Sequence, residues 1–146
     1  MKVLMKKLAP EAVLPKYGSP YAAGADLCAY LPEGEITVAP GKTVLIGTGL
    51  AMELEAGFVG LIYARSGLAT RQGLAPANKV GVVDADYRGE IFVPMHNHGE
   101  SAQVIEPGER IAQMIITPFL TAAFLEADEL SETPRGEKGF GSTGRI

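Results

Sequence analysis

The chain has 146 residues, of which 47% are hydrophobic and 21% are charged, so its composition is that of a globular protein rather than a disordered one. This length fits one domain with a single hydrophobic core. The formal net charge of −4 argues against general affinity for nucleic acid. A strongly anionic ligand would therefore need local arginines, backbone N–H groups or a metal ion.

The expected strands lie between turn signals, in a sequence that contains 18 glycines and 10 prolines. They are the apolar segments 35–39, 58–64, 90–95 and 110–117. A short helix is expected after the second of them, with Ser66 as its N-cap and Gly73 as the residue that ends it. Many short strands with one short helix favour an all-β sandwich, jelly roll or barrel.

The last sixteen positions, residues 131–146, contain four glycines, one proline and almost no residues suited to a core. We therefore expect a β-rich core over residues 1–130, followed by a tail that is flexible in the free protein. The glycine spacing of the tail fits the dinucleotide-binding fingerprint and, in part, a P-loop. Neither motif is accepted, because the first lacks its strand and helix and the second lacks its lysine.

The single cysteine, Cys28, cannot form a disulfide within the chain, which is typical of proteins from a reducing cytoplasm. We expect Cys28 itself to be a small buried hydrophobic residue. No apolar run approaches the ~18 residues that a membrane span needs, and the N-terminal stretch is interrupted by lysines unlike a signal peptide. A cytoplasmic protein that does not bind membranes is expected.

Two polar groups are weighed against simpler interpretations. Arg65, the Ser66 hydroxyl and the Gly67 N–H would meet at the helix N-terminus, where anions bind, although an ordinary helix cap explains them equally well. His96 and His98 would share one face of a strand. Without a third ligand we expect these histidines to be surface residues rather than a zinc site.

The stretch GVVDADYRGEI contains two aspartates, Asp84 and Asp86. In a fully extended segment their side chains would share a face about 6–7 Å apart. We assign Asp86 to holding the turn that follows. Asp84 ends an apolar run, where partial desolvation would suit a general base that activates water. These residues allow a triphosphate site but do not require one.

Five segments, taken together and in order, resemble the five motifs of the trimeric deoxyuridine triphosphatase (dUTPase) family. They are AGADLCAY (23–30), ARSGLA (64–69), NKVGVVDADYRGEI (78–91), PGERIAQMII (107–116) and RGEKGFGSTG (135–144). The resemblance implies a distorted, barrel-like jelly roll, a homotrimer with active sites shared between subunits, and hydrolysis of dUTP to dUMP and pyrophosphate. Such a reaction keeps uracil out of DNA and supplies dUMP for thymidylate synthesis. Glu109 departs from the fourth motif, which usually has aspartate there.

The resemblance also implies a role for each matching residue. Asp84 would activate the water that attacks the α-phosphorus in line, and Asp26 would be a supporting carboxylate. Tyr87 would pack beneath the deoxyribose and leave no room for a 2′-hydroxyl. Uracil would be bound by the residues of one hairpin, through the Asn78 side chain and the backbone of Gly81, Val82 and Val83.

The phosphate chain would be held by residues of the second and fourth motifs, namely Arg65, Ser66, Gly67 and Gln113. Residues of the tail would complete the site, with Phe140 stacked over uracil and the β- and γ-phosphates bound by Arg135, Gly141 and Ser142. Mg²⁺ would bind through the phosphate oxygens of the substrate rather than in a cage of protein ligands.

Two alternative functions differ in what they require. A dCTP deaminase would have a related fold but needs an added acid–base glutamate near the second motif, and ARSGLATRQG contains none. A non-catalytic nucleotide-binding or interaction module of the same fold would need neither Asp84 nor the tail.

Overall fold

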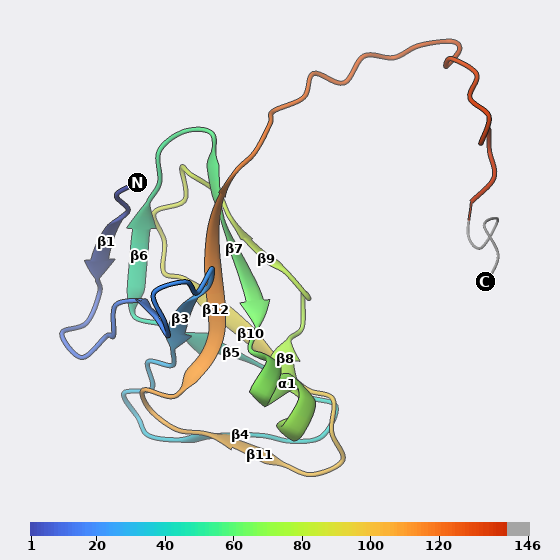
Figure 1. The fold of residues 1–146 in the computed structure, drawn as a ribbon. Coiled ribbons are helices and arrows are strands. Elements are labelled where there is room, and N and C mark those ends of the chain that lie inside the picture. The colour runs from blue at the N-terminus through green and yellow to red at the C-terminus, as the bar shows by residue number, and fades with distance from the viewer. Residues whose placement is uncertain (140–146) are drawn as a thin grey trace.

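The structure is a computed structural model, and it describes residues 1–139 (Figure 1). Within these residues the chain forms twelve strands and one helix, which confirms the expected all-β class. The strands are β1 (Leu4–Lys7), β2 (Lys16–Tyr17), β3 (Ala25–Cys28), β4 (Ile36–Val38), β5 (Thr43–Gly47), β6 (Leu50–Glu53), β7 (Phe58–Ala64), β8 (Leu74–Pro76), β9 (Gly81–Val83), β10 (Phe92–Asn97), β11 (Gln103–Ile105) and β12 (Arg110–Pro118), and the helix is α1 (Ser66–Gln72).

Four sheets enclose one hydrophobic core. The largest has the strand order β2-β3-β12-β7-β9, and the second has the order β5-β10-β8. Strands β1 and β6 form a third sheet, and β11 and β4 form a fourth. Every sheet and the helix contribute buried side chains to the same cluster, which includes Leu27, Val38, Ile46, Met52, Ile62, Leu68, Met95 and Ile111.

The four expected strands are present. The segment expected over 58–64 is β7, and those expected over 35–39 and 110–117 correspond to β4 and β12. The strand expected over 90–95 begins later, as β10 at Phe92. Its first two positions belong to a loop instead, because the Ile91 N–H donates to the Leu50 carbonyl at 2.8 Å and ties this segment to β6.

The N-cap of the helix lies one residue earlier than expected. Arg65, with φ −88° and ψ 126°, is the N-cap, and no side chain caps the helix. The expectation that Ser66 is the N-cap is therefore wrong, because Ser66 already has helical geometry. Gly73 ends the helix as expected, with φ 68°, a left-handed conformation that glycine adopts without steric cost.

Cys28 is only half-buried, so the expectation of a fully buried thiol is wrong. Side chains alternate along β3, and Ala25 and Leu27 are the residues that enter the core. Cys28 therefore shares the opposite face with Asp26. Burial and, after it, the negative charge of Asp26 raise the pKa of the Cys28 thiol, against the opposing charges of nearby cations.

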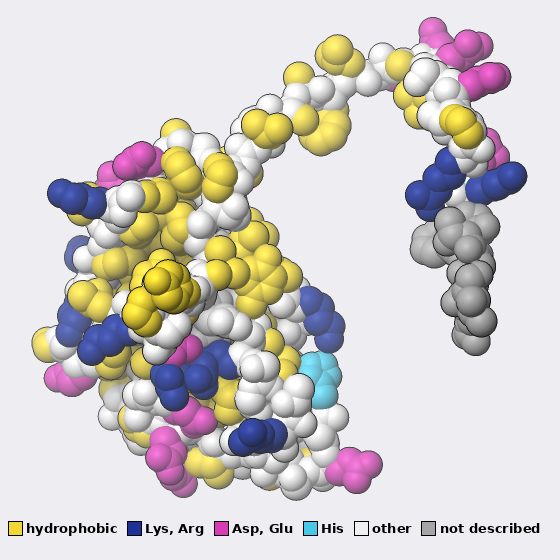
Figure 2. Space-filling model, viewed as in Figure 1, with side chains coloured by type: hydrophobic (Ala, Val, Ile, Leu, Met, Phe, Trp, Pro, Cys, Tyr) yellow, Lys and Arg dark blue, Asp and Glu magenta, His cyan; other side chains and the backbone are white. Residues whose placement is uncertain are grey.

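Beyond β12 the chain runs away from the sheets, as Figure 1 shows for residues 119–139. The Phe119 N–H donates to the Gly57 carbonyl, and within the described chain no hydrogen bond joins residues 120–139 to the sheets. Apolar side chains lie exposed along this segment (Figure 2), including Leu120, Phe124 and Leu125. The boundary expected at residue 130 between core and tail stays a prediction. No helix within residues 1–139 is long and apolar enough to span a membrane.

Candidate active site

A row of polar side chains crosses one face of the five-stranded sheet. Gln113 of β12 pairs with Asp26 of β3 on one side and with Tyr63 of β7 on the other. Directly opposed residues of antiparallel strands point to the same face of a sheet, so the three side chains are neighbours. The Gln113 amide donates from Nε2 to the Ala64 carbonyl at 2.8 Å. It also covers Gly24, where a Cβ would lie 2.6 Å from Gln113 Oε1.

Two arginines meet on the carboxylate of Asp26. Arg65 Nε donates to Oδ1 at 2.9 Å, and Arg110 Nη1 donates to Oδ2 at 3.1 Å. Arg65 Nη1 also donates to the backbone carbonyl of Arg110 at 3.0 Å. The Asp26 side chain is only 15% exposed. Because both of its oxygens are occupied, Asp26 orients two guanidinium groups whose remaining N–H groups are available to an anion.

Arg110 is a candidate site residue that sequence reasoning did not identify. It stands in the PGERIAQMII segment, but its partner Asp26 lies 84 positions earlier. The pairing of β12 with β3 also shifts its register between Arg110 and Ala112. A contact between residues 84 positions apart, across a register shift, leaves no recognisable pattern in the sequence around either residue. The only available signal was the charge of Arg110 next to the segment that carries Gln113.

Two clefts flank the Asp26–arginine cluster. One, of about 410 Å³, is lined by residues that include Arg65, Gly67, Arg71 and Arg110. The other, of about 550 Å³, is lined by residues that include Gly24, Tyr63, Lys79 and Gln113. Figure 2 shows cationic and acidic side chains gathered over the lower part of the visible face. Ser66 is exposed at the first position of α1, between Arg65 and Gly67. These clefts can accept an elongated anionic ligand.

The turn that connects β8 and β9 is tight, but within residues 1–139 these two strands pair with β10 and β7 rather than with each other, so the expected hairpin is not formed. The Val80 N–H donates to the Asn78 carbonyl at 2.7 Å, and Lys79 between them has φ 64°. This geometry is that of a γ-turn, an uncommon and strained conformation for a residue with a side chain. At Gly81 a Cβ would lie 3.1 Å from the Ile62 Cβ and 3.4 Å from Asn78 Nδ2. The absence of a side chain at Gly81 therefore lets β9 lie close to β7.

The residues after Gly81 alternate along β9. Val82 is exposed, and the Val83 side chain is buried in the core. Their register places Val82 opposite Leu61 and Val83 opposite Gly60. Asn78, Gly81, Val82 and Val83, which the resemblance assigns to one hairpin, therefore lie in the turn after β8 and along β9.

The segment that carries the two aspartates is a turn rather than an extended strand. The Tyr87 N–H donates to the Asp84 carbonyl at 3.2 Å, and Arg88 Nη1 donates to the Ala85 carbonyl at 2.6 Å. The expectation that the Asp86 carboxylate holds this turn is therefore wrong, because backbone carbonyls hold it. The Asp84 side chain is exposed in the chain, and the partial desolvation expected for it is not present there.

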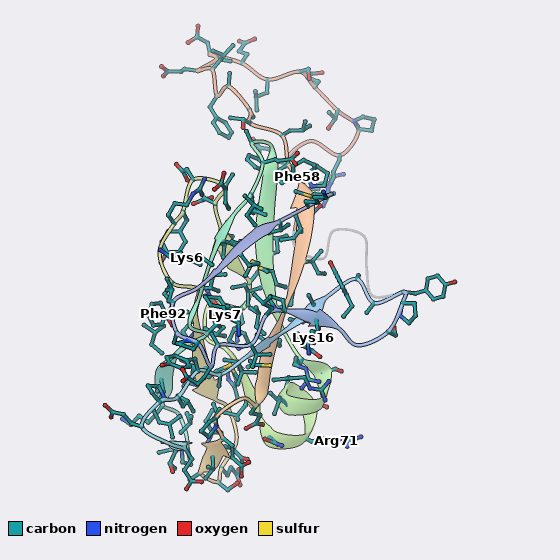
Figure 3. All side chains as sticks on the ribbon, turned by 90° about the vertical axis from the view of Figure 1, so that its left-hand side faces the viewer. Lys6, Lys7, Lys16, Phe58, Arg71 and Phe92 are labelled. Carbon is teal, nitrogen blue, oxygen red and sulfur yellow. The ribbon has the colours of Figure 1, made fainter. Side chains whose placement is uncertain are left out.

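The turn with Asp84 lies far from the Asp26–arginine cluster. Val83 pairs with Gly60 near the start of β7, whereas Arg65 follows the end of β7. Gly60 and Arg65 are five positions apart, which corresponds to about 17 Å along an extended strand. Figure 3 labels Phe58, at the start of β7, and Arg71 of α1, which follows the other end of that strand. One chain therefore presents two separate groups of candidate residues.

The remaining candidates lie elsewhere. Arg135 is exposed in the tail, and its Nε donates to the Lys138 carbonyl at 2.9 Å. Phe140, Gly141 and Ser142 lie outside the described residues. His96 and His98 are in contact, with ring centroids 4.3 Å apart, and His96 Nδ1 lies 2.8 Å from the Thr43 hydroxyl. Across residues 1–139, no group of three or more His, Cys, Asp or Glu side chains is arranged to hold a metal ion.

Replacement of Asp26 by alanine should destabilise the fold, because it leaves the guanidinium groups of Arg65 and Arg110 facing each other without the carboxylate that both bind. The expected loss is about 1–3 kcal/mol in the free energy of unfolding, the range for hydrogen bonds to charged groups. Urea denaturation would measure it, with the exposed Asp86→Ala as the control. Equal stability of the two variants would mean that the Asp26 pairs contribute nothing to the fold.

Comparison with known proteins gives a consistent result. A family model described as dUTPase matches residues 10–144. A curated deoxyuridine 5'-triphosphate nucleotidohydrolase of Desulfitobacterium hafniense (strain DSM 10664 / DCB-2) is 54% identical over 132 residues, which cover 90% of this chain and 87% of that protein.

Solved structures agree. The dUTPase of Staphylococcus bacteriophage 80alpha, solved with dUPNHPP, aligns with a TM-score of 0.89 at 28% identity over 98% of both chains. A variant dUTPase from phage phi11 of S. aureus, whose structure describes the coordination of a structural Mg(II) ion, has a TM-score of 0.80 at 20% identity over 90% of this chain and 100% of that chain, and it shows the fold alone. These likenesses confirm the jelly-roll-like fold. With almost its whole length matched by the family model, the chain belongs to the dUTPase family.

Proposed function

We propose that this protein hydrolyses dUTP to dUMP and pyrophosphate, by in-line attack of water on the α-phosphorus. The observation that carries this function is the match of the dUTPase family model to residues 10–144, which include all five motifs. The reaction would keep uracil out of DNA and supply dUMP for thymidylate synthesis. The single cysteine supports the expected cytoplasmic location, since a reducing compartment favours chains without disulfides.

The active site is completed between subunits of a homotrimer. The distance along β7 supports this, because the strand positions that carry the Asp84 turn and Arg65 are about 17 Å apart in one chain, too far for both to act on adjacent groups of one substrate. A neighbouring subunit that brings its own Asp26 cluster to the Asp84 turn would remove the gap. Exposed apolar side chains on the sheets, including Leu45, Val82 and Phe92, support an association between chains.

The chain's own residues would then divide the work. Asp84 holds the attacking water and takes its proton on a carboxylate oxygen, and its side chain forms no ion pair among residues 1–139. Arg65 and Arg110, oriented by Asp26, bind phosphate oxygens together with the Ser66 hydroxyl and the Gly67 N–H. The Asn78–Val83 segment binds uracil through its backbone, and the glycine at position 81 lets that backbone lie close to β7.

The donor set fits Mg²⁺ carried by the substrate. Both oxygens of Asp26 accept hydrogen bonds from arginines, and no cluster of three or more ligands is formed among residues 1–139. Mg²⁺ prefers phosphate oxygens and water and needs few protein ligands. When bound, it would withdraw charge from the phosphate chain and make the α-phosphorus easier to attack.

The tail, residues 131–146, would close over the bound nucleotide as a lid. Its described part is exposed and carries Arg135, which is suited to the β- and γ-phosphates. Phe140 would cover uracil, and the Gly141 N–H and the Ser142 hydroxyl would add donors to the phosphates. Closure of such a lid excludes water from the site and completes the set of binding groups.

Release of pyrophosphate from dUTP, dCTP and dTTP tests this function against its alternatives. A dUTPase should release it from dUTP and leave the other two almost unchanged. A dCTP deaminase is not favoured, because α1 has no acidic residue in its first turn. In the same assay a deaminase would release ammonia from dCTP instead of pyrophosphate. A non-catalytic module would bind nucleotide and release nothing from any of the three, a result that would contradict the proposal.

Replacement of Tyr87 by alanine should admit UTP, because the ring would no longer occupy the space of a 2′-hydroxyl. The ratio of kcat/KM for dUTP to that for UTP should fall by at least about tenfold, since a steric clash of this kind corresponds to more than 1 kcal/mol. Activity on dTTP should stay low, because the backbone of the Asn78–Val83 segment rather than Tyr87 would exclude a 5-methyl group. Equal gains with UTP and dTTP would show that the two exclusions are not separate.

A further inference from the structure

Glu90 is a half-buried carboxylate that none of the roles above explains. Its Oε1 accepts a hydrogen bond from the backbone N–H of Gly49 at 2.8 Å. Among residues 1–139 it forms no ion pair with a lysine or arginine. A carboxylate that is partly removed from water without a cationic partner lowers stability unless its hydrogen bonds compensate. Glu90 therefore calls for an explanation beyond surface charge.

The Glu90 side chain packs against two glycines at the turn between β5 and β6. Gly49 is buried and has φ 66°, a left-handed conformation that turns its N–H toward Glu90. A Cβ at Gly47 would lie 2.5 Å from Glu90 Oε1. Because neither glycine has a side chain, the Glu90 carboxylate can lie directly against the backbone of this turn.

The backbone next to Glu90 is fixed to the same turn. The carbonyl of Ile91 accepts from both the Thr48 N–H at 3.2 Å and the Thr48 hydroxyl at 2.8 Å. The Ile91 N–H donates to the Leu50 carbonyl at 2.8 Å. Thr48 is 0% exposed and Ile91 is 1% exposed. The segment from Glu90 to Ile91 is therefore held by four hydrogen bonds to a buried turn.

The Tyr87 ring rests on this fixed segment. Its hydroxyl donates to the Glu90 carbonyl at 2.8 Å. The ring crosses Gly89, where a Cβ would lie 2.6 Å from Cζ and 3.0 Å from Cε2 of Tyr87. At its other end, the Tyr87 N–H is bound to the Asp84 carbonyl. Tyr87 is 44% exposed, yet its hydroxyl is bound to one fixed acceptor, the Glu90 carbonyl.

We propose that Glu90 is a positioning residue that fixes the orientation of the Tyr87 ring and thereby sets how strongly the site excludes a 2′-hydroxyl. The inference rests on the proposed function, in which Tyr87 packs beneath the sugar. A ring that can swing away makes room for a ribose, whereas a ring tied to an immobile carbonyl does not. The side chain of Glu90 acts through its own backbone, because its bond to Gly49 immobilises the carbonyl that accepts from Tyr87.

The ratio of kcat/KM for dUTP to that for UTP tests this role in three variants of the full chain. Glu90→Ala should lower the ratio about fivefold, the change expected from loss of one hydrogen bond of ordinary strength. Glu90→Gln keeps an acceptor oxygen for the Gly49 N–H and should retain the wild-type ratio. Glu53→Ala is the matched control, because Glu53 is an exposed glutamate of β6 whose ion pair, at 4.0 Å, is with Arg88 of the loop that carries Glu90.

Tyr87→Phe supplies a variant that leaves Glu90 and the β5–β6 turn intact. It removes the hydroxyl that binds the Glu90 carbonyl and should lower the ratio to a similar extent. The double variant Glu90→Ala/Tyr87→Phe should then fall no further than the larger single effect, since both changes break one connection. Additive effects in this cycle would overturn the inference.

Melting temperatures separate positioning from support of the fold. A Glu90→Ala variant that melts lower but keeps the wild-type ratio would show that Glu90 is structural only, and it would overturn the inference while leaving the proposed function untouched. Failure of the proposed function gives a different result. In that case the wild-type chain would not prefer dUTP to UTP, or Tyr87→Ala would leave its preference unchanged.

Discussion

Replacement of Asp84 by asparagine should lower the turnover of dUTP by about 10²–10⁴-fold, the usual contribution of a general base. Asparagine has nearly the same shape and can still hold a water molecule, but it cannot take the proton when that water attacks. The fold should be unaffected, because the turn is held by the Asp84 backbone carbonyl, which asparagine retains. Nucleotide binding should also persist.

The matched control for this variant is Asp86→Asn. Asp86 belongs to the same turn and is exposed like Asp84, so the two substitutions remove the same charge from nearly the same place. Steady-state turnover of dUTP, together with the affinity for a non-hydrolysable dUTP analogue, would compare them. Turnover of the Asp84 variant near that of the control would remove Asp84 from the mechanism.

Deletion of the chain from Pro134 onward should abolish most activity while leaving the melting temperature nearly unchanged. Residues 120–139 make no hydrogen bond to the sheets within the described chain, so little of the fold depends on them. The nucleotide would lose Arg135 and the donors that follow it. A large fall in melting temperature would instead make the tail a structural element.

Mixing this deletion with Asp84→Asn tests the shared site. In the proposed trimer each site takes Asp84 from one subunit and the tail from another, so a mixed trimer regains one site with both parts intact. Co-refolding of equal amounts should give about three-quarters mixed trimers and about a quarter of wild-type activity, provided the sites act independently. If both parts served the same chain's site, no mixture could exceed its parents.

Two controls make the mixing result decisive. Each inactive protein refolded alone sets the background, and differently tagged subunits recovered in one oligomer prove that exchange occurred. Activity that stays at the background after proven exchange would contradict the shared site. Such a result would not affect the test of Asp84 as the general base, because that test measures turnover of the Asp84→Asn variant alone.

The elements predicted best from the sequence are those with a strong local pattern. The continuous apolar run of β7 and the glycine that ends α1 each follow from neighbouring residues, and both were placed within a residue. Short-range chemistry decides such features, because the turn residues and side-chain alternation act within a few positions.

Features that depend on long-range pairing were not predictable. The bridge from Arg110 to Asp26 spans 84 positions and crosses a register shift in the sheet. The exposure of Asp84 and its distance from Arg65 depend on which end of β7 pairs with β9. Ser66 was misplaced as the cap for a smaller reason, since a serine at a helix start fits the cap and the first helical position almost equally well.

The position of β12 has a consequence for the synthesis of the protein. It is the last strand of the described chain, yet it lies between β3 and β7 in the middle of the largest sheet. Until the ribosome has produced Arg110–Pro118, β3 and β7 have open edges facing one another. Until then the backbone groups at these edges are unpaired and can pair with other chains. The largest sheet can therefore form only late in synthesis or after it.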